Sequence, residues 1–381
     1  MKRLAAILLV GLVVTGGMAA VASGGTAADP LISQSYITGT YIPSAVKAAS
    51  DRIDAATAKT YDAAQVRLKA QAELYLARVG VSSGASAYAD SLQEGRYKRG
   101  DVITVDAGSG FMLLAGSATL SYQSGAALDV TAGTAVPSGT AMTAQRRYLA
   151  AENTLVLATV TSDTAVLAFQ GYYVLTASKA TDYNQLATAL GVMGLFQGTG
   201  TSYGSGYDLE RVPTRMEGLV LFLRLIGEEK AALAYTGASP FADVPDWGRR
   251  YVAYAYEKGY TKGVDEEHML FGSENIVSAG EYLTFLLRAL GYRDSGDSPD
   301  FTWDTALIRG QALGVITAGE RALLAPERPF LRAQVAYLSY YALAANRRAG
   351  GTLQSYLISA GTLKLNQVNA AQAAVTVQRV S

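Results

Sequence analysis

The stretch PTRMEGLVLFLRLIGEE, residues 213–229, decides how the C-terminal half of this 381-residue chain folds. A polar tetrapeptide is followed at once by a dense apolar run. Thr214 and Glu217 have the spacing of a capping box, in which a hydroxyl and a carboxylate bind the free amides at a helix start. The stretch therefore predicts a helix that begins after Thr214. Arg215 takes no part in the box, so its charge on the first turn needs another explanation.

The apolar run recurs twice further along the chain. LFLRLIG at 221–227 matches FLLRALG at 285–291, and FLRAQVAYLSYYALA at 330–344 is a more divergent copy. A shorter helical pattern precedes each copy and ends at a glycine, as a left-handed cap requires. These glycines are Gly194, Gly259 and Gly314. Three copies predict a repeat architecture, in which each unit buries its apolar face against its neighbours.

The first turns of the copies differ in an informative way. The second copy starts with SAGE at 278–281, so Ser278 and Glu281 keep the capping box while the arginine is lost. The third starts with LRAQ at 331–334, which keeps Arg332 and loses the capping hydroxyl. The tetrapeptide therefore has two separable roles, one that starts the helix and one that belongs to the arginine.

Composition excludes several functions. The chain has 32 basic and 32 acidic side chains, so its zero net charge gives no electrostatic case for nucleic-acid binding. It has no cysteine, which excludes disulfides, thiolate metal sites and a cysteine nucleophile. Its one histidine, His268, lacks the second histidine of a zinc helix, so we expect it in a solvated loop. We expect neither a metal nor a cofactor.

The N-terminus has the pattern of an export signal. Lys2 and Arg3 precede an apolar run at 4–14, and AVA at 20–22 offers small residues for cleavage, with TAA at 26–28 as a second option. The run is too short for a bilayer, which takes about 20 apolar residues, and no later segment is long enough. Residues 1–22 are therefore predicted to be a signal peptide, and the mature protein to be secreted without a transmembrane segment.

The remaining chain predicts an α+β protein of several domains. Residues 29–93 are expected to be a helical segment, either solitary or a short coiled coil, followed by a linker. Residues 96–179 contain short alternating runs separated by glycine turns, which is typical of a small all-β sandwich or barrel. The repeats occupy 182–348, and 349–381 form a C-terminal tail.

Three motifs within the repeats identify a family. FADVPDW at 241–247, GYTKGV at 259–264 and TRME at 214–217 resemble the motifs of S-layer homology (SLH) domains, so 182–348 looks like three of these in tandem. The resemblance implies an all-α, pseudo-threefold assembly. It also implies non-covalent anchoring of an exported protein to the cell wall, at the cell surface, through secondary cell-wall polysaccharide that often carries pyruvate ketals.

The resemblance also implies which residues bind the polymer. An arginine fork suits a pyruvate carboxylate, and a helix N-terminus beside it adds amides and a positive dipole end. A tryptophan face suits the apolar side of a sugar ring. The positions that match the family's binding residues are Arg215, Arg332, Asp243, Trp247, Trp303, Gly198 and Gly263. Because the second copy lacks the arginine, we expect fewer than three working grooves, with those of Arg215 and Arg332 as candidates.

Structural alternatives apply to several of these residues. An arginine on a helix surface is usually a solvated charge, so Arg215 has that alternative interpretation. Trp247 and Trp303 have an alternative role as core anchors between repeats. Arg224 and Arg288 lie deep in apolar helices and are expected to form structural pairs between repeats.

Three functions remain open, of which a non-enzymatic wall anchor is the main hypothesis. The second is a structural array protein, in which the N-terminal helix and the β-domain self-associate. The third is a wall-acting hydrolase that uses SLH domains as its anchor. A hydrolase needs paired carboxylates within residues 29–179, and the acids of the β region show no characteristic setting. These acids are Asp101, Asp106, Asp129, Glu152 and Asp163.

Overall fold

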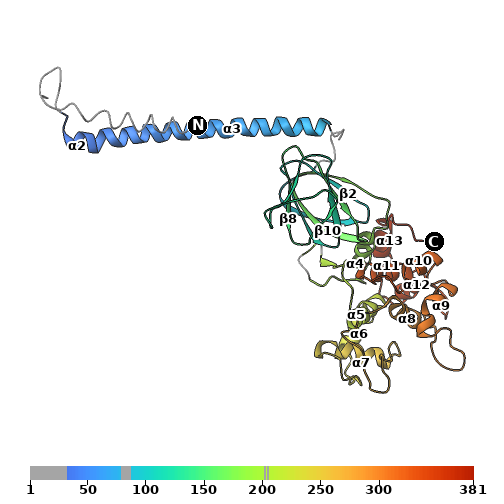
Figure 1. Cartoon of the computed structure of the whole chain (residues 1–381). Helices are drawn as coiled ribbons and strands as arrows, with labels where there is room; N and C mark the ends of the chain where they lie inside the picture. The colour runs from blue at the N-terminus through green and yellow to red at the C-terminus, as the bar shows by residue number, and fades with distance from the viewer. Residues whose placement is uncertain (1–31, 79–86, 201–202, 204–205) are drawn as a thin grey trace. The chain divides into compact units, whose positions relative to one another are not determined.

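The chain divides into two compact units, Met1–Gly84 and Ala85–Ser381. The computed structural model describes residues 32–78, 87–200, 203 and 206–381 (Figure 1). The expected signal peptide, residues 1–22, lies outside the described residues. Within the described part, no helix has both the length and the apolar character needed to cross a bilayer.

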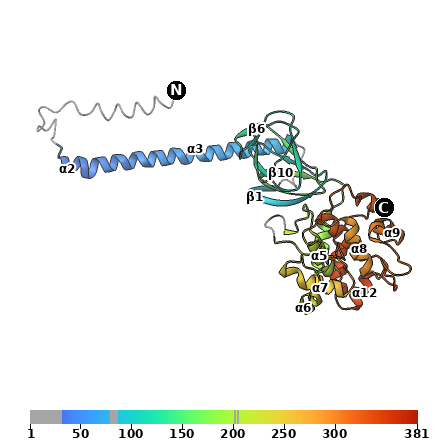
Figure 2. The same ribbon diagram turned by 60° about the horizontal axis from the view of Figure 1, so that its bottom comes forward.

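The first unit is built on one continuous helix (Figure 2). Its parts are α2 (Gln34–Tyr36), the π-helical turn η1 (Ile37–Tyr41) and α3 (Ile42–Arg78). Alanine is frequent in α3, and alanine has the highest helix propensity. All side chains from 32 to 69 are exposed within the structure. The expected N-terminal helix is thus confirmed.

A ten-stranded antiparallel sheet opens the second unit. Its strands are β1 (Ala87–Lys98), β2 (Val102–Val105), β3 (Gly110–Ala115), β4 (Ala118–Ser121), β5 (Ala127–Asp129), β6 (Thr134–Val136), β7 (Thr140–Ala141), β8 (Arg147–Ala150), β9 (Val156–Val160) and β10 (Thr164–Thr176). The sheet order is β6-β5-β8-β3-β10-β2-β9-β4-β7, and β1 also pairs with β10. The expected small sandwich or barrel is confirmed as a near-closed antiparallel sheet around its own core.

The long strand β10 organises this β-domain. It pairs with β1 over most of its length, and with β3 and β2 in succession. Phe111 and Phe169 pack with parallel rings in the core, with centroids 6.5 Å apart. The domain begins earlier than residue 96, because β1 starts at Ala87 inside the stretch expected to be a linker. Backbone pairing with β10 thus overrides the weak strand propensity of its small residues.

Helices form the rest of the second unit. They are α4 (Tyr183–Val192), α5 (Arg215–Leu225), α6 (Glu229–Ala234), η3 (Asp246–Gly248), α7 (Arg249–Glu257), α8 (Ala279–Ala289), η4 (Trp303–Thr305), α9 (Ala306–Ala312), α10 (Ala318–Leu323), α11 (Arg332–Ala342), α12 (Leu353–Ser359) and α13 (Leu365–Ala373). The shorter helices α4, α7 and α9 are followed by the glycines predicted to cap them. These have positive φ: Gly194 at 75°, Gly259 at 69° and Gly314 at 73°.

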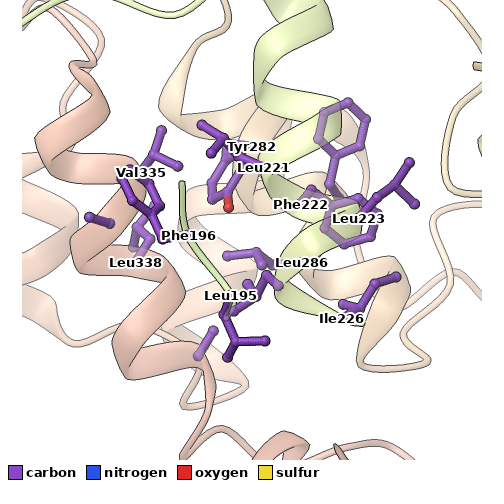
Figure 3. Close-up of a cluster of buried hydrophobic side chains, with 14 of the residues drawn as sticks. Leu195, Phe196, Leu221, Phe222, Leu223, Ile226, Tyr282, Leu286, Val335 and Leu338 are labelled. Atoms are coloured by element: carbon purple, nitrogen blue, oxygen red, sulfur yellow. The ribbon is translucent and has the colours of Figure 1, made fainter. Parts of the chain in front are cut away.

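The core of the helical region lies between α5, α8 and α11, which contact one another pairwise. Figure 3 shows their apolar side chains converging, with Phe222 of α5, Tyr282 of α8 and Val335 of α11 among them. The Tyr282 hydroxyl and the Ser339 hydroxyl are hydrogen-bonded at 2.7 Å inside this core, so the buried phenol is not left without a partner. The three copies of the sequence repeat thus become three helices around one shared core.

The C-terminal residues pack against the repeats. Leu353 and Leu357 of α12 and Val368 of α13 are buried in the same core. Beyond α13 the chain continues to Arg379, whose guanidinium binds both oxygens of the Glu320 carboxylate at 2.7 and 2.9 Å. Residues 349–381 are therefore an ordered part of the helical region.

Candidate functional site

Both predicted capping boxes are present. At α5, the Glu217 amide donates to the Thr214 hydroxyl at 3.3 Å, and the Thr214 amide donates to the Glu217 carboxylate at 2.9 Å. At α8, Ser278 and Glu281 make the same two bonds at 3.2 and 2.8 Å. At α11, where the hydroxyl is missing, the Gln334 side chain still accepts from the preceding amide, that of Leu331, at 2.9 Å. The sequence therefore identifies these helix starts correctly.

The first turn of α5 docks on the loop that precedes α8. The Arg215 amide donates to the Asn275 carbonyl at 2.7 Å, and the Met216 amide donates to the Ser273 carbonyl at 3.3 Å. We call this junction the Arg215 interface. It joins the first repeat to the second through backbone groups that a helix start leaves free.

The first turn of α11 docks in the same way on the loop that precedes α5. The Arg332 amide donates to the Arg211 carbonyl at 2.8 Å, and the Ala333 amide donates to the Leu209 carbonyl at 3.0 Å. We call this junction the Arg332 interface. Its two acceptors lie 64 positions before those of the Arg215 interface, the same offset that relates the sequence copies. The two junctions are thus equivalent in geometry.

Arg215 is buried at its interface, with its side chain 7% exposed. Its Nη1 donates to Glu281 Oε1 at 2.6 Å, and its Nη2 makes a long contact of 3.4 Å to the Gly263 carbonyl. The guanidinium lies over the rings of Phe271 and Phe285, at 5.2 and 5.4 Å from their centroids. Burial lowers its pKa below the usual range, although Glu281 opposes this. The interpretation as a solvated surface charge is therefore wrong.

One donor of Arg215 remains unused. Among the described residues, its Nε is buried without a hydrogen-bond partner, and so is the hydroxyl of Ser273 in the adjoining loop. A buried polar group without a partner costs about 1–3 kcal/mol. In some proteins a water molecule or an ion completes the bonding of such a group, and within the described chain the Nε of Arg288 is buried without a partner in the same way.

Arg332 is equally buried, and two of its three side-chain nitrogens are hydrogen-bonded. Its Nε donates to the Tyr207 carbonyl at 3.1 Å, and its Nη2 donates to the Gln197 carbonyl at 3.0 Å. The guanidinium lies over the Phe196 ring at 5.3 Å. Burial lowers its pKa as well, with the nearby Glu217 charge opposing this. The Nε atom that Arg215 leaves without a partner is therefore hydrogen-bonded in Arg332.

The two candidate glycines allow the loops to close tightly. A Cβ on Gly263 would lie 2.4 Å from the Leu270 carbonyl oxygen, and one on Gly198 would lie 2.0 Å from the Gly206 carbonyl oxygen. Gly263 also has a φ of 83°, which disfavours other residues. Their loops supply the backbone carbonyls that face the arginines, those of Gly263 and Gln197.

Asp243 organises the loop of the Arg215 interface. Its carboxylate accepts from the amides of Phe271, Gly272 and Ser273 at 2.8, 2.6 and 3.3 Å. Burial alone would raise the pKa of this carboxyl, but the three amides outweigh burial and hold the pKa below its usual range. Asp243 thus fixes the position of the Phe271 ring, which packs on Arg215.

The two tryptophans are exposed, Trp247 by 58% and Trp303 by 76%. Their interpretation as buried core anchors is therefore wrong. Trp247 belongs to η3, which packs beside the first turn of α5, because a Cβ on Gly248 would lie 3.0 Å from Met216. Trp303 belongs to η4, which faces the first turn of α8, where Ala279 replaces the arginine. Within the described chain, the Arg215 interface thus has both an arginine and a neighbouring tryptophan.

The remaining charged candidates have local roles. Arg224 pairs with Glu229 at 2.8 Å, and Arg288 donates to the Tyr260 carbonyl at 2.7 Å. These contacts stay within one repeat or its following loop, so the expected pairs between repeats are wrong. His268 is exposed and contacts Asp265 at 2.7 Å, which confirms the solvated loop. Within the described residues, no three acidic or histidine side chains gather as a metal site would require.

Sequence reasoning missed the partners that define the Arg215 interface. The Arg215–Glu281 pair joins two repeats, whereas the sequence indicates Glu281 only as part of its capping box. Ser273 carries no motif at all. The one signal in the sequence is that Glu281 lies at the third position of a capped helix. No protein-family model and no curated protein matches the chain.

Proposed function

We propose that residues 182–348 are SLH repeats, which anchor an exported protein non-covalently to the cell wall by binding an anionic secondary polysaccharide. The protein is then a cell-surface binding protein without catalytic activity. The motifs at 214–217 and 241–247 suggest this family, and the export pattern at 1–22 suits this location.

The observation that carries the proposal is the unpartnered Nε of Arg215, on a helix turn that packs beside η3, the element that carries the exposed Trp247. A pyruvate ketal presents a planar carboxylate, which an arginine fork binds through two hydrogen bonds. Among the described residues, Arg215 Nε has no partner, and Nη2 has only its long contact to Gly263. The indole of Trp247, 58% exposed, offers a flat apolar face to the sugar ring.

A polymer carboxylate that binds Arg215 takes the place of the Glu281 carboxylate on the guanidinium. Arg215 Nη1 is held by Glu281 Oε1, while Glu281 Oε2 is held by the Ser278 amide at 2.8 Å. The Glu281 side chain is 30% exposed and Arg215 only 7%, so solvent reaches the pair from the glutamate side. A polymer carboxylate therefore approaches Arg215 past Glu281, which keeps its own capping bond when it yields the guanidinium.

The test is a pull-down of the chain lacking residues 1–22 with cell-wall sacculi, before and after hydrofluoric acid removes the secondary polymer. We expect binding to intact sacculi and little binding to extracted sacculi. Equal binding to both would overturn the anchor proposal. Binding is also expected to weaken as salt rises, because an ion pair at a partly exposed site is screened.

A matched pair of variants tests the site. Arg215→Ala removes the proposed ligand fork, whereas Arg224→Ala removes another arginine of the same helix, one paired with Glu229. We expect the first variant to lose retention on intact sacculi and the second to keep it. If both variants are retained on intact sacculi as well as the parent chain, the anchor proposal stands but Arg215 is not part of the binding site.

A structural array protein is the second candidate, and the exposure of α3 favours it. The helix carries exposed apolar side chains at Val46, Ile53, Val66 and Leu68, which pairing with another chain would cover. Light scattering on residues 23–180 separates the two cases. A concentration-dependent rise in mass supports an array, whereas a constant monomer mass argues against it.

A further inference from the structure

The β-domain docks on the helical region beside the Arg332 interface. Arg96 of β1 donates to the Asn184 side chain of α4 at 3.1 Å and lies 3.5 Å from Glu210. Its guanidinium also lies over the Tyr207 ring, 5.9 Å from the centroid. The carbonyl of this same Tyr207 accepts from Arg332 Nε at 3.1 Å. One residue is therefore contacted both by the β-domain and by the arginine of the interface.

A second contact reaches the first turn of α11 itself. Gln334, two positions after Arg332, donates through Nε2 to the Asp163 carboxylate of the β-domain at 2.7 Å. The loop on the other side of the interface is reached by Gln145, which donates to the Tyr203 hydroxyl at 3.2 Å. The β-domain thus contacts both halves of the Arg332 interface, the helix start and the loop. These contacts fall outside the residues that form the Arg215 interface.

The junction between α8 and α11 lacks the charged pair that is found at the Arg215 interface. At the Arg215 interface, Arg215 opens one capped helix and pairs with Glu281, the third residue of the next capped helix. The corresponding residues of α8 and α11 are Ala279 and Gln334. Both partners of the ion pair are therefore replaced together. Gln334 instead forms a hydrogen bond with Asp163 of the β-domain. A glutamate at this position would place a second carboxylate against Asp163.

We infer that the chain has a single polymer-binding interface, that of Arg215, and that its own β-domain flanks the equivalent Arg332 interface and keeps the polymer out of it. This inference rests on the proposed function and narrows it to one site per chain. Three features separate the sites. Arg332 Nε and Nη2 donate to carbonyls, the β-domain flanks that junction, and η3, which carries the exposed Trp247, packs beside the first turn of α5.

The test is calorimetric titration of the chain lacking residues 1–22 with a methyl glycoside that carries a 4,6-linked pyruvate ketal. We expect one site per chain. The matched variants are Arg215→Lys and Arg332→Lys, which keep the charge and lose the planar fork. Arg215→Lys is expected to weaken binding at least tenfold, whereas Arg332→Lys leaves affinity and stoichiometry unchanged. Circular dichroism of both variants establishes that they are folded.

The outcomes distinguish the inference from the function on which it rests. Two sites per chain would overturn the inference while leaving the anchor in place, as would equal weakening by the two lysine variants. If either variant fails to fold, the stoichiometry of the parent chain decides by itself. A parent chain that binds neither the glycoside nor intact sacculi would overturn the proposed function itself.

Discussion

Arg215 and Glu281 join the first turns of two successive capped helices, with Nη1 of the arginine 2.6 Å from Oε1 of the glutamate. The other glutamate oxygen, Oε2, accepts from the Ser278 amide and so closes the capping box of α8. One carboxylate therefore starts its own helix and holds the arginine of the preceding repeat. The pair makes the junction between the repeats depend on charge as well as on packing.

This double role predicts coupling between Arg215 and Glu281. Glu281→Gln keeps a capping side chain but removes the countercharge of a buried guanidinium, so we expect a loss of about 2 kcal/mol, below the full cost for a completely buried pair. A double-mutant cycle with Arg215→Met, read by urea unfolding, should give a coupling energy of about 1–2 kcal/mol.

The control cycle combines Arg215→Met with Thr352→Ala, which removes the capping hydroxyl of the separate helix α12. Loss of that cap is expected to cost about 1 kcal/mol and to add independently. Additive effects in the Arg215–Glu281 cycle as well would show that the contact contributes nothing to stability.

A second prediction concerns the buried Glu320 carboxylate, whose side chain is 0% exposed. Arg379 binds both of its oxygens, and the Tyr337 hydroxyl donates to it at 3.0 Å. Arg379→Ala leaves this carboxylate without its countercharge, so we expect a loss of about 3 kcal/mol in the free energy of unfolding. Arg321→Ala, an exposed arginine in the same helix as Glu320, should change it by less than about 0.5 kcal/mol. Similar values for the two variants would contradict the pairing.

The sequence predicted the order of the fold well, because its signals are local. Capping boxes at Thr214 and Ser278, and glycines with positive φ after the shorter helices, depend on a few adjacent residues. The start of the β-domain was missed because β1 forms through pairing with β10, the last strand of the domain. Small residues such as Ala87 and Ala89 carry no local sign of that distant partner.

The site was predicted less well, for a physical reason. The sequence motif includes both Arg215 and Arg332. The two residues differ only in the tertiary contacts of their side chains. Arg215 keeps a free Nε, whereas Nε and Nη2 of Arg332 donate to carbonyls from a loop more than 100 positions earlier. The docking of the β-domain through Arg96 and Gln334 likewise joins distant segments, and no periodicity reports such contacts.

A third prediction follows from Asp243, whose folded-state pKa lies below its usual value of about 3.9. A carboxyl with a depressed folded pKa stabilises the fold above its unfolded pKa, and this stabilisation is lost as pH falls through the folded pKa. We therefore expect Asp243→Asn to cost about 1 kcal/mol at pH 7, a modest value because the residue is exposed. The difference from the parent should shrink below about pH 4.

Thermal unfolding between pH 2 and pH 7 measures this difference. Asp246→Asn is the matched control, because its side chain is 93% exposed and lies three positions further along the chain, at the start of η3. We expect the control to follow the parent at every pH. A deficit of Asp243→Asn that stays constant down to pH 2 would mean that its cause is steric and not the loss of a charged acceptor.

The last prediction compares two glycines of the second repeat. Gly263 has a φ of 83°, and a Cβ there would lie 2.4 Å from the Leu270 carbonyl oxygen. Gly259 has a φ of 69° and open space around its Cβ position. Gly259→Ala should therefore cost only the left-handed backbone strain, about 1 kcal/mol. Gly263→Ala adds a clash with backbone that has to move, so we expect about 3 kcal/mol in urea unfolding.

Because the Gly263 carbonyl faces Arg215, the Gly263→Ala variant should also weaken retention on sacculi, whereas Gly259→Ala should retain it. Equal costs for the two variants would show that the loop yields freely and does not hold the Arg215 interface in place.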